Sequence, residues 1–556
     1  MKLKIALFCA FLFLQGYLSQ ILAQNRTVSG VVTGGTAATP LAGASVTVKG
    51  TTAGTTTDER GNFSLSVPSS ARTLVISYTG MANREVDIPA SGVVSVGLAD
   101  LAGTMNEVIV VGYGTQKKSV VTGAISSVKA GDLENQPINR VEQFLQGRAS
   151  GLTIAQASGQ PGSGSTLRVR GTTTLGNSDP LYVVDGVPVD IGGIDYLNPN
   201  DIESIEVLKD AASAAIYGAR AAAGVLLITT KKGRSGTMRV NYNGYYGTQR
   251  PARKLHLLNA EQYATLRNEA LVNDGKAPAF ANPHALGAGT DWQDLIFSDN
   301  AKIQDHQVSI SGGTDRSTFY TSFALFDQDG IVAPEISNYK RFTIRLNSTH
   351  KISKWITFGN NLGYSHIKAM GIGNTNSEYG GLLSSAVNLD PLTQVVITDP
   401  VAANSAPYAP SAFNGNGVYT IRDANGNPYG ISELVRQEMS NPLAYIQTHR
   451  GNHGWSDNFV GNAFVELEPV KGLKLRTNIG AKYAFWGSES FSGPYVFNAV
   501  NFSDDTTFYR ESNRALNFTF ENTASYGRRF GLHNVSLLVG TGAYVDNYLS
   551  RNGGVT

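Results

Sequence analysis

The sequence contains almost no cysteine and no long apolar run after its first residues. Its 556 residues include one cysteine, Cys9, and no later segment approaches the length of apolar run that a membrane helix needs. That length is about 20 consecutive apolar residues. We therefore expect neither a disulfide framework nor a transmembrane helix. If the chain crosses a bilayer, it must do so as a closed β-barrel, because only helices and barrels satisfy every backbone group in hydrocarbon.

The sequence also lacks an excess of either charge. It has 45 basic and 43 acidic residues, a formal net charge of +2, which gives no basis for nucleic-acid binding. None of its eight histidines begins an H-x-x-E pair. No nucleophile, base and metal ligands form a recognisable set, so we predict no enzyme activity, no catalytic residue, no metal and no cofactor. The 61 glycines, 24 tyrosines and 23 phenylalanines fit a strand-rich chain with aromatic girdles.

The N-terminus has the pattern of an export signal. Lys2 and Lys4 precede the apolar run Ile5 to Leu14, and Ile21-Leu22-Ala23 precedes a cut before Gln24. We predict a signal peptide over residues 1–23. Cys9 lies inside the apolar run, too early for a lipidated cysteine at the cut, so we expect export without a disulfide or a lipid anchor.

Residues 24–100 alternate short β-type runs with turn residues. The runs are Val28 to Val32, Ala44 to Val48, Phe63 to Val67 and Leu74 to Tyr78. Several short strands within about 70 residues predict a small antiparallel β-sandwich.

Residues 105–115 form a separate extended segment. Glu107, Val108, Ile109, Val110 and Val111 carry no helix signal and are followed by Gly112, Tyr113 and Gly114. Such a β-branched run can add as a strand to an exposed sheet edge of a partner, where main-chain hydrogen bonds supply the affinity. The alternative is an ordinary linker strand that packs on the preceding sandwich.

Residues 116–235 predict an α+β globule. Ile205 and Val207 alternate with Glu206 and Leu208, and Gly224 to Thr230 reads as a buried strand. Between them we expect Asp210 to cap an alanine-rich turn that Gly218 closes.

From residue 238 to residue 556 the apolar period becomes two. Val240 and Tyr242 alternate with polar residues, as do Phe342, Ile344 and Leu346. Runs of about 9 to 11 residues with one oily and one polar face are typical of transmembrane strands. Short turns near 312–315, 351–354, 469–471 and 528–531 alternate with longer inserts at about 248–302, 327–338, 366–455 and 485–513, as in bacterial barrels. We count about nine strands, too few to close a plugged barrel, and expect an N-terminal fragment of a longer protein.

Three further features have two interpretations each. Gly159, Gly162 and Gly164 in SGQPGSGS superficially resemble a phosphate loop, but neither Lys-Ser nor Lys-Thr follows, so we interpret the segment as a flexible loop. His449 and His453 have metal-like spacing, yet the intervening Gly451 argues against a helix and favours a loop pair without metal. Aromatic residues in the inserts either stack on sugars or peptides or pack within loops and girdles. They are Trp292, Tyr408, Tyr429, Tyr445 and Trp455.

Four sequence blocks in order resemble the SusC/RagA family of TonB-linked outer-membrane transporters. They are MNEVIVVGYGTQKKS, LQGRASGLTIAQASGQPGSGSTLRVRG, DPLYVVDGVPV and LNPNDIESIEVLKDAASAAIYGARAAAGVLLITTKKG. The segment before them resembles the carboxypeptidase-regulatory-like domain, an accessory fold without peptidase chemistry. The resemblance implies a mainly β chain: a small antiparallel β-sandwich, an α+β plug domain and then an incomplete antiparallel transmembrane β-barrel.

The resemblance assigns residues 105–115 as the TonB box. The residues expected to bind TonB are Glu107, Val108, Ile109, Val110, Val111, Gly112, Tyr113 and Gly114. In the plug, a charged set is expected to form ion pairs with the polar barrel wall that a pulling force can break. It comprises Arg168, Arg170, Asp185, Glu203, Glu206, Lys209 and Asp210.

The implied function is import of oligosaccharides or peptides through the cell outer membrane, driven by the inner-membrane proton gradient through TonB. The implied partners are TonB, a SusD-like lipoprotein and outer-membrane lipid, with no nucleic acid. Two alternatives stay open: a siderophore or cobalamin receptor, which shares the TonB box and plug, and a surface adhesin without uptake. An adhesin has no need of a TonB box.

Overall fold

The structure is a computed structural model that separates into two compact units. Residues 1–109 with 115–121 form the first unit, and residues 110–114 with 122–556 form the second. The residues that the structure describes are 25–34, 39–51, 53–78, 81, 83–98, 108–111, 114–117, 125–129, 131, 140–172, 174–189, 193–210, 214–373, 381–409, 420–435, 439–531 and 533–555. The predicted signal peptide lies outside them.

The first unit is a two-sheet sandwich, as predicted. One sheet contains β1 (Asn25–Gly34), β2 (Thr39–Pro40), β5 (Asn62–Pro68) and β8 (Val93–Leu98). The other contains β3 (Ser45–Val48), β4 (Gly54–Thr56), β6 (Thr73–Ser77) and β7 (Arg84–Asp87). Strand β5 shows why the sheets stack: Phe63, Leu65 and Val67 are buried while every alternate residue is exposed. The expected all-antiparallel arrangement is wrong at one pair, because β8 runs parallel to β1.

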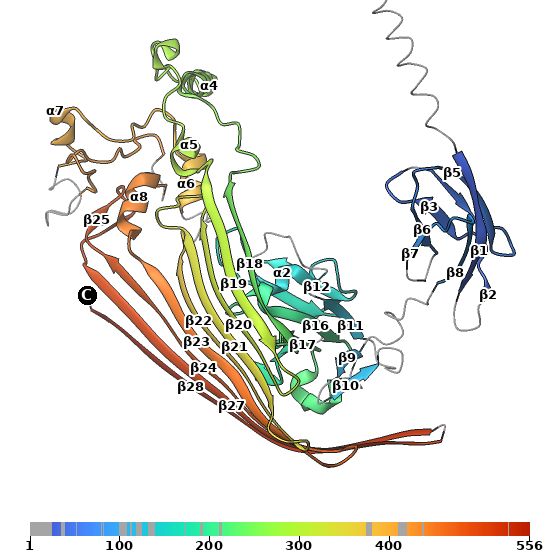
Figure 1. Ribbon diagram of the computed structural model, residues 1–556. Helices are drawn as coiled ribbons and strands as arrows, with labels where there is room; N and C mark the ends of the chain where they lie inside the picture. The colour runs from blue at the N-terminus through green and yellow to red at the C-terminus, as the bar shows by residue number, and fades with distance from the viewer. Residues whose placement is uncertain are drawn as a thin grey trace, which may run out of the picture. The chain divides into compact units, whose positions relative to one another are not determined.

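The segment between the sandwich and the plug forms a pair of short strands (Figure 1). Strand β9 covers Val108–Val111 and pairs with β10, which covers Gly114–Lys117. The predicted extended conformation is therefore confirmed for residues 108–111. Glu107, Gly112 and Tyr113 lie outside the described residues.

The plug is a mixed five-stranded sheet with a separate hairpin. The sheet order is β11 (Ile125–Lys129), β16 (Ile202–Leu208), β17 (Val225–Thr230), β14 (Leu181–Val184) and β15 (Val187–Val189). The hairpin joins β12 (Leu152–Gln156) to β13 (Ser165–Val169), and α2 covers Val141–Leu145. Central β17 reads VLLITT because apolar residues cover both faces: Leu226 and Ile228 face one cluster, and Val225 and Leu227 the other.

The alanine-rich turn of the plug differs from its prediction. It is the 3₁₀ segment η4, Ala215–Ala221, and Ala214 rather than Asp210 is its N-cap. Gly218 does not close it. Gly218 has φ 64° and ψ −152° and makes a kink within η4, a conformation that glycine adopts without steric cost. The sequence predicted an unusual backbone conformation at Gly218, but not that η4 continues past it to Ala221.

The nine predicted long strands form one antiparallel sheet, here called the wall. In order along the sheet they are β18 (Gly236–Gln249), β19 (Ala301–Gly313), β20 (Ser317–Asp329), β21 (Asn338–Lys351), β22 (Ile356–Met370), β23 (His453–Val470), β24 (Leu473–Ser492), β27 (Thr507–Phe530) and β28 (His533–Val555). The plug sheet lies against one face of this curved wall (Figure 1). Sequence order equals spatial order, as in an up-and-down barrel.

The burial pattern of the wall is inside out compared with a soluble sheet. On β21, Arg341, Thr343 and Arg345 are buried under the plug, whereas Leu346 on the opposite face is 47% exposed. Exposed apolar residues on the same outer face of neighbouring strands include Phe323, Leu362, Phe459 and Ile479. The polar face of the predicted alternation is thus the packed face, which suits a strand with lipid on its other side.

The short turns and long inserts lie at opposite ends of the wall, as predicted (Figure 1). The turns are residues 314–316, 352–355, 471–472 and 531–532, and the inserts are 250–300, 330–337, 371–452 and 493–506. The last insert is shorter than expected because β24 continues to Ser492 and β27 begins at Thr507. The glycine and polar residues of 486–492 and 507–513 suggested a loop, but the backbones of these two segments pair with each other and extend both strands.

Parts of the inserts 250–300, 330–337 and 371–452 pack into one apolar cluster, here called the insert core. It contains Trp292, Ile372, Leu382 and Ile446. The short elements are α4 (Ala260–Asn273), η5 (Pro283–Leu286), α5 (Trp292–Ile296), α6 (Leu382–Asn388), α7 (Pro400–Ala403), α8 (Pro442–His449), β25 (Tyr495–Val496) and β26 (Phe502–Ser503). Among the residues described, no helix combines the length and apolar character that crossing a membrane requires.

Candidate functional site

The plug and the wall meet at a buried carboxylate that sequence reasoning had not selected. Asp201 ends the 3₁₀ turn η3 (Pro199–Asp201), whose N-cap Asn198 accepts a hydrogen bond from Asn200 N through its side chain. One oxygen of Asp201, Oδ1, accepts hydrogen bonds from Gln307 Nε2 at 2.6 Å, Tyr320 Oη at 2.8 Å and Ser322 Oγ at 2.6 Å. All three donors come from wall strands β19 and β20. Three hydrogen bonds from the wall to one carboxylate oxygen fix the position of Asp201 against β19 and β20.

A second carboxylate joins the same contact through an arginine of the wall. Arg345 Nη1 lies 3.4 Å from Asp185 Oδ2, and Arg345 Nε lies 3.8 Å from Asp201 Oδ2. These three side chains are 7%, 4% and 3% exposed, respectively. One wall cation therefore lies between two plug anions, so removal of Arg345 would leave two uncompensated buried charges.

The hydroxyl of Thr230 completes this network. Thr230 donates from Oγ1 to Asp185 Oδ2 at 2.7 Å and from its backbone N to Asp185 Oδ1 at 3.0 Å. From the wall, Asn347 Nδ2 donates to Thr230 Oγ1 and to the Lys231 carbonyl, both at 2.8 Å. We call Asp185, Asp201, Thr230, Arg345 and Asn347 the plug–wall network. It connects the ends of plug strands β14, β16 and β17 to wall strand β21.

Further polar contacts continue on either side of the network. Asn462 Nδ2 donates to the Asp185 carbonyl at 3.2 Å, and Arg341 Nη1 donates to the Asp195 carbonyl at 3.0 Å. Asn200 Nδ2 donates to Asp305 Oδ2 at 3.2 Å. The contact therefore extends across strands β19 to β23, and its members lie far apart in the sequence.

The predicted charged set divides between the wall and the plug. Asp185 reaches the wall, whereas Arg168 and Glu203 have other partners among the described residues, so an ion pair of either residue with the wall stays a prediction. Arg168 pairs with Asp179 inside the plug, and Glu203 pairs with Arg234 of the linker at 2.8 Å. Both partners are closer in sequence than any wall residue.

Lys209, Arg170 and Asp210 have hydrogen-bond partners inside the plug. Lys209 Nζ donates to Ser150 Oγ at 2.8 Å, and Arg170, whose φ is 56°, bonds through its backbone N to the Gly151 carbonyl at 2.8 Å. Among the described residues no ion pair to Arg170 is found. Asp210 accepts a backbone hydrogen bond from Ala214 through its carbonyl at 3.1 Å.

Glu206 lies inside the plug instead of at its surface. It is 2% exposed on β16, opposite Ser127 of edge strand β11, and its Oε2 has no hydrogen-bond partner in the part of the chain that the structure describes. Burial raises the pKa of the Glu206 carboxyl to about 7, although Ser204 and Lys129 act in the opposite direction. A carboxyl whose pKa is about 7 thus lies on β16, next to β11, the first strand of the plug sheet.

The glycine-rich loop between β12 and β13 contacts the insert core through Gln160 and wall strand β21 through Gly162. The Gln160 side chain reaches the insert core: its Oε1 accepts from Ile372 N at 3.1 Å and its Nε2 donates to the Gly373 carbonyl at 3.4 Å. Gly162, at φ 70°, sits against the Tyr339 ring so closely that an added Cβ would lie 2.1 Å from a ring carbon. The segment is a loop, as predicted, and these contacts connect it to the insert core and to β21.

Three of the aromatic candidates and both histidines are buried or have partners within the protein. Trp292 is 2% exposed within the insert core, and Tyr408 is 8% exposed, so neither ring face is available for stacking on a ligand. Tyr445 stacks on His449 with ring centroids 3.9 Å apart. His449 ends α8 and His453 begins β23, and each donates through Nδ1 to a backbone carbonyl, that of Tyr445 and that of Gly451 respectively.

Sequence reasoning missed Asp201, Thr230 and Asn347 because single polar residues at strand ends carry no local signal. Asn347 and Arg345 were visible only as the polar half of a dyad repeat. That repeat predicts which face of β21 points inward. No other sequence feature indicated that Arg345 and Asn347 contact the plug.

The sequence and the fold both match known proteins. The TonB-dependent Receptor Plug Domain family matches residues 117–225, and the CarboxypepD_reg-like domain family matches residues 28–111. The TonB-dependent receptor P3 of Formosa agariphila is 34% identical over 544 residues, covering 97% of this chain and 50% of that protein. The TonB-dependent receptor SusC of Bacteroides thetaiotaomicron is 33% identical over 548 residues, covering 96% of this chain and 51% of that protein.

A solved structure shows the same fold. The RagAB peptide importer in its open-open state superposes with a TM-score of 0.62 at 24% identity, covering 81% of this chain and 53% of the compared chain. The chain spans about half the length of the curated relatives it matches. With the sandwich, the plug and the inside-out wall in that order, this outer-membrane chain belongs to the SusC/RagA family of TonB-dependent receptors.

Proposed function

We propose that the protein imports oligosaccharides or peptides through the outer membrane by a TonB-driven movement of its plug. The observation that carries this proposal is the plug–wall network. A plug held by one buried arginine between two carboxylates is strongly retained at rest, and it is released when a displacement separates those charges. An adhesin with no uptake role has no use for a plug retained in this way.

Coupling to TonB would use the backbone of strand β9. Within the described residues β9 pairs only with β10, so one edge of β9 has no strand beside it. A strand of TonB can add to such an edge through main-chain hydrogen bonds, with little demand on side chains. Glu107, Val108, Ile109, Val110, Val111, Gly112, Tyr113 and Gly114 would form this contact, and the inner-membrane proton gradient would supply the work.

The substrate class and the lid partner rest on the relatives. The SusC match runs along 96% of this chain, whereas the match to the ferric enterobactin receptor PirA covers 27% of it, which weighs against a siderophore. The RagAB peptide importer, which has the same fold, is consistent with a peptide substrate. We propose a SusD-like lipoprotein as the partner at the insert end of the wall. The full-length protein should co-purify with such a lipoprotein, whose absence would favour the siderophore-type alternative.

The direct test is uptake by cells that express the full-length protein. A deletion strain and its complemented form are given a panel of labelled oligosaccharides and peptides, with and without an uncoupler of the proton gradient. We expect the complemented strain alone to accumulate members of one class, and the uncoupler to stop accumulation without stopping surface binding. Binding without uptake in every condition would support the adhesin alternative instead.

A further inference from the structure

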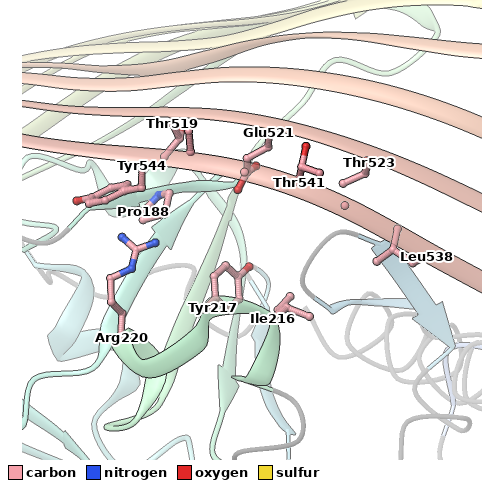
Figure 2. Close-up of a pocket in the computed structure, with 13 residues that line it drawn as sticks. Pro188, Ile216, Tyr217, Arg220, Thr519, Glu521, Thr523, Leu538, Thr541 and Tyr544 are labelled. Carbon is pink, nitrogen blue, oxygen red and sulfur yellow. The ribbon is translucent and has the colours of Figure 1, made fainter.

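The wall has a hollow on each of its two faces, and the hollows differ in chemistry. On the plug side, a cavity of about 410 Å³ lies between η4 and strands β27 and β28, and hydroxyls, a carboxylate and a guanidinium line it (Figure 2). On the outer face, a groove of about 420 Å³ crosses strands β21 to β24. Leu346, Leu362, Phe459 and Ile479 line this outer groove, and each is about half exposed. An apolar groove that faces a bilayer suits a hydrocarbon chain.

Close strand packing and small side chains create the outer groove. Gly461 on β23 and Ala481 on β24 are cross-strand partners that line it. A Cβ at position 461 would lie 2.4 Å from the Asn361 carbonyl oxygen, so this position requires glycine. The next pair toward the inserts is Tyr364 and Phe459, whose ring centroids are 4.7 Å apart. Two aromatic rings therefore bound the groove on its insert side.

Two lysines face each other on the outer face of the wall, nearer the inserts than the groove. Lys340 of β21 and Lys368 of β22 are direct partners in register, and both are exposed. Lys340 shares the Asp327 carboxylate with Lys302, at Nζ–Oδ2 distances of 3.6 and 3.2 Å respectively. Within the described part of the chain, Lys368 has no ion-pair partner. Because like charges directly opposite each other destabilise a strand pair, an anion that bridges the two lysines would stabilise the wall.

The nearby carboxylates already have partners. Asp457 Oδ1 accepts from Tyr364 Oη at 2.7 Å and from His366 Nδ1 at 2.9 Å. Asp329 Oδ1 accepts from Asn338 Nδ2 at 2.6 Å. These contacts leave the Lys368 ammonium available to an anion from outside the chain.

The lysine pair and the groove are placed as the two parts of one amphiphile. Strands rise about 3.4 Å per residue, so Lys340 lies about 14 Å along β21 from Ile344, which lines the groove. Trp455 is the partner of Lys368 on β23, and tryptophan is enriched where a membrane meets water. Barrels have their longer connections on the outer side of the membrane. The lysines therefore lie at the head-group level of the outer leaflet, with the groove below them in the hydrocarbon.

We propose that the outer face of β21 to β24 binds a phosphate-bearing lipid of the outer leaflet. Its phosphate would bridge Lys340 and Lys368, and one of its acyl chains would fill the groove. A free phosphate would satisfy the lysines alone, and a lipid without an anionic head group would satisfy the groove alone. Binding of this lipid is independent of the import function and requires only the outer-membrane location of the wall.

Native mass spectrometry of the full-length protein in detergent tests the head-group contact. The probes are dipalmitoyl phosphatidic acid and dipalmitoyl phosphatidylcholine, which have the same chains and differ in head-group charge. Wild type should bind phosphatidic acid more tightly than phosphatidylcholine. The double variant Lys340→Gln with Lys368→Gln should bind phosphatidic acid roughly tenfold more weakly. The matched control is Lys351→Gln with Lys354→Gln, which removes two exposed lysines at the other end of β21, and it should bind as wild type does.

A filling substitution tests the groove separately. Ala481→Leu places a larger side chain in the groove and should weaken binding of both lipids several-fold. Ala463→Leu, at an exposed position that also lines the groove, provides a second variant of the same kind. Heat-modifiable mobility confirms that each variant has folded.

Three results overturn the proposal. The double lysine variant binds phosphatidic acid as tightly as wild type, or both filling variants bind the lipids unchanged, or millimolar inorganic phosphate displaces phosphatidic acid completely. The last result would assign the lysines to a free anion. A lipid-free dimer of the wild type that Ala481→Leu dissociates would likewise contradict lipid binding, because it would assign the groove to a second copy of this chain.

Discussion

Gln160 of the plug and Ile372 of the insert core are joined through a side-chain amide and a backbone. Gln160 Oε1 accepts from Ile372 N at 3.1 Å, while the Ile372 carbonyl accepts from Tyr445 Oη at 3.3 Å. Ile372 itself is 3% exposed among the apolar residues of the inserts. A movement of the insert core therefore acts directly on the β12–β13 loop of the plug.

Gln160→Ala should uncouple the plug loop from the inserts. It removes both hydrogen bonds to the backbone of residues 372 and 373, with an expected loss of roughly 1–2 kcal/mol in local stability. Amide hydrogen exchange of residues 157–164 in the full-length protein measures this loss. Gln156→Ala, on the same hairpin, is the control and should leave those amides protected. Equal exchange in both variants would show that the Gln160 contacts do not hold the loop.

Arg345→Met should loosen the plug in the wall. It removes the cation between Asp185 and Asp201 and retains most of the side-chain volume, with a cost on the order of 3–5 kcal/mol for a buried pair. Protease cleavage within the plug of the folded, full-length protein should become faster. Lys474→Met is the control, since its pair with Glu466 is half-exposed and such pairs contribute only about 0–1 kcal/mol. Cleavage at the wild-type rate in Arg345→Met would contradict the role of the network.

Ile109→Pro should abolish uptake while assembly and surface ligand binding stay near wild type. Proline removes one backbone donor and restricts φ, so it disrupts a strand that pairs edge-on with TonB. Ile109→Ala keeps the backbone and should be much milder. Uptake of a labelled substrate and site-specific cross-linking to TonB measure both variants. If the proline variant transports normally, or if both variants fail to assemble, β9 is a structural linker.

The β11–β16 pair should become less stable as pH rises from about 5 to about 7. The folded pKa of Glu206 is raised to about 7 from an ordinary value of 4.5. Across this window the folded state keeps the proton that the unfolded state has lost, so ionisation favours opening of the strand pair. The stability lost approaches about 3 kcal/mol.

Hydrogen exchange of the β16 amides, corrected for the intrinsic pH dependence of exchange, measures this effect. Glu206→Gln cannot ionise and should show no such slope. Glu203→Gln, which alters an exposed pair with Arg234, should keep it. A slope that persists in Glu206→Gln would assign the effect to another group.

Sequence alone determined the order and type of the structural parts. Alternation with period two predicted the nine wall strands, since each side of a strand meets a different environment, and the structure confirms it at Phe342, Ile344 and Leu346. The run Gly224 to Thr230 predicted a central plug strand because a strand covered on both faces has no polar side. These features depend on residues close together in the chain, where pattern is informative.

Only the tertiary structure decided which polar residues meet. Asp185 and Arg345 are 160 positions apart, and Asp201 and Tyr320 are 119 apart, so no local pattern relates them. Of the plug charges selected from sequence, Asp185 pairs with the wall, whereas Arg168 pairs with Asp179 and Glu203 with Arg234. The contribution of a buried charge to stability depends on the groups around it. For Asp185 and Asp201 these groups come together only when the plug packs against the wall.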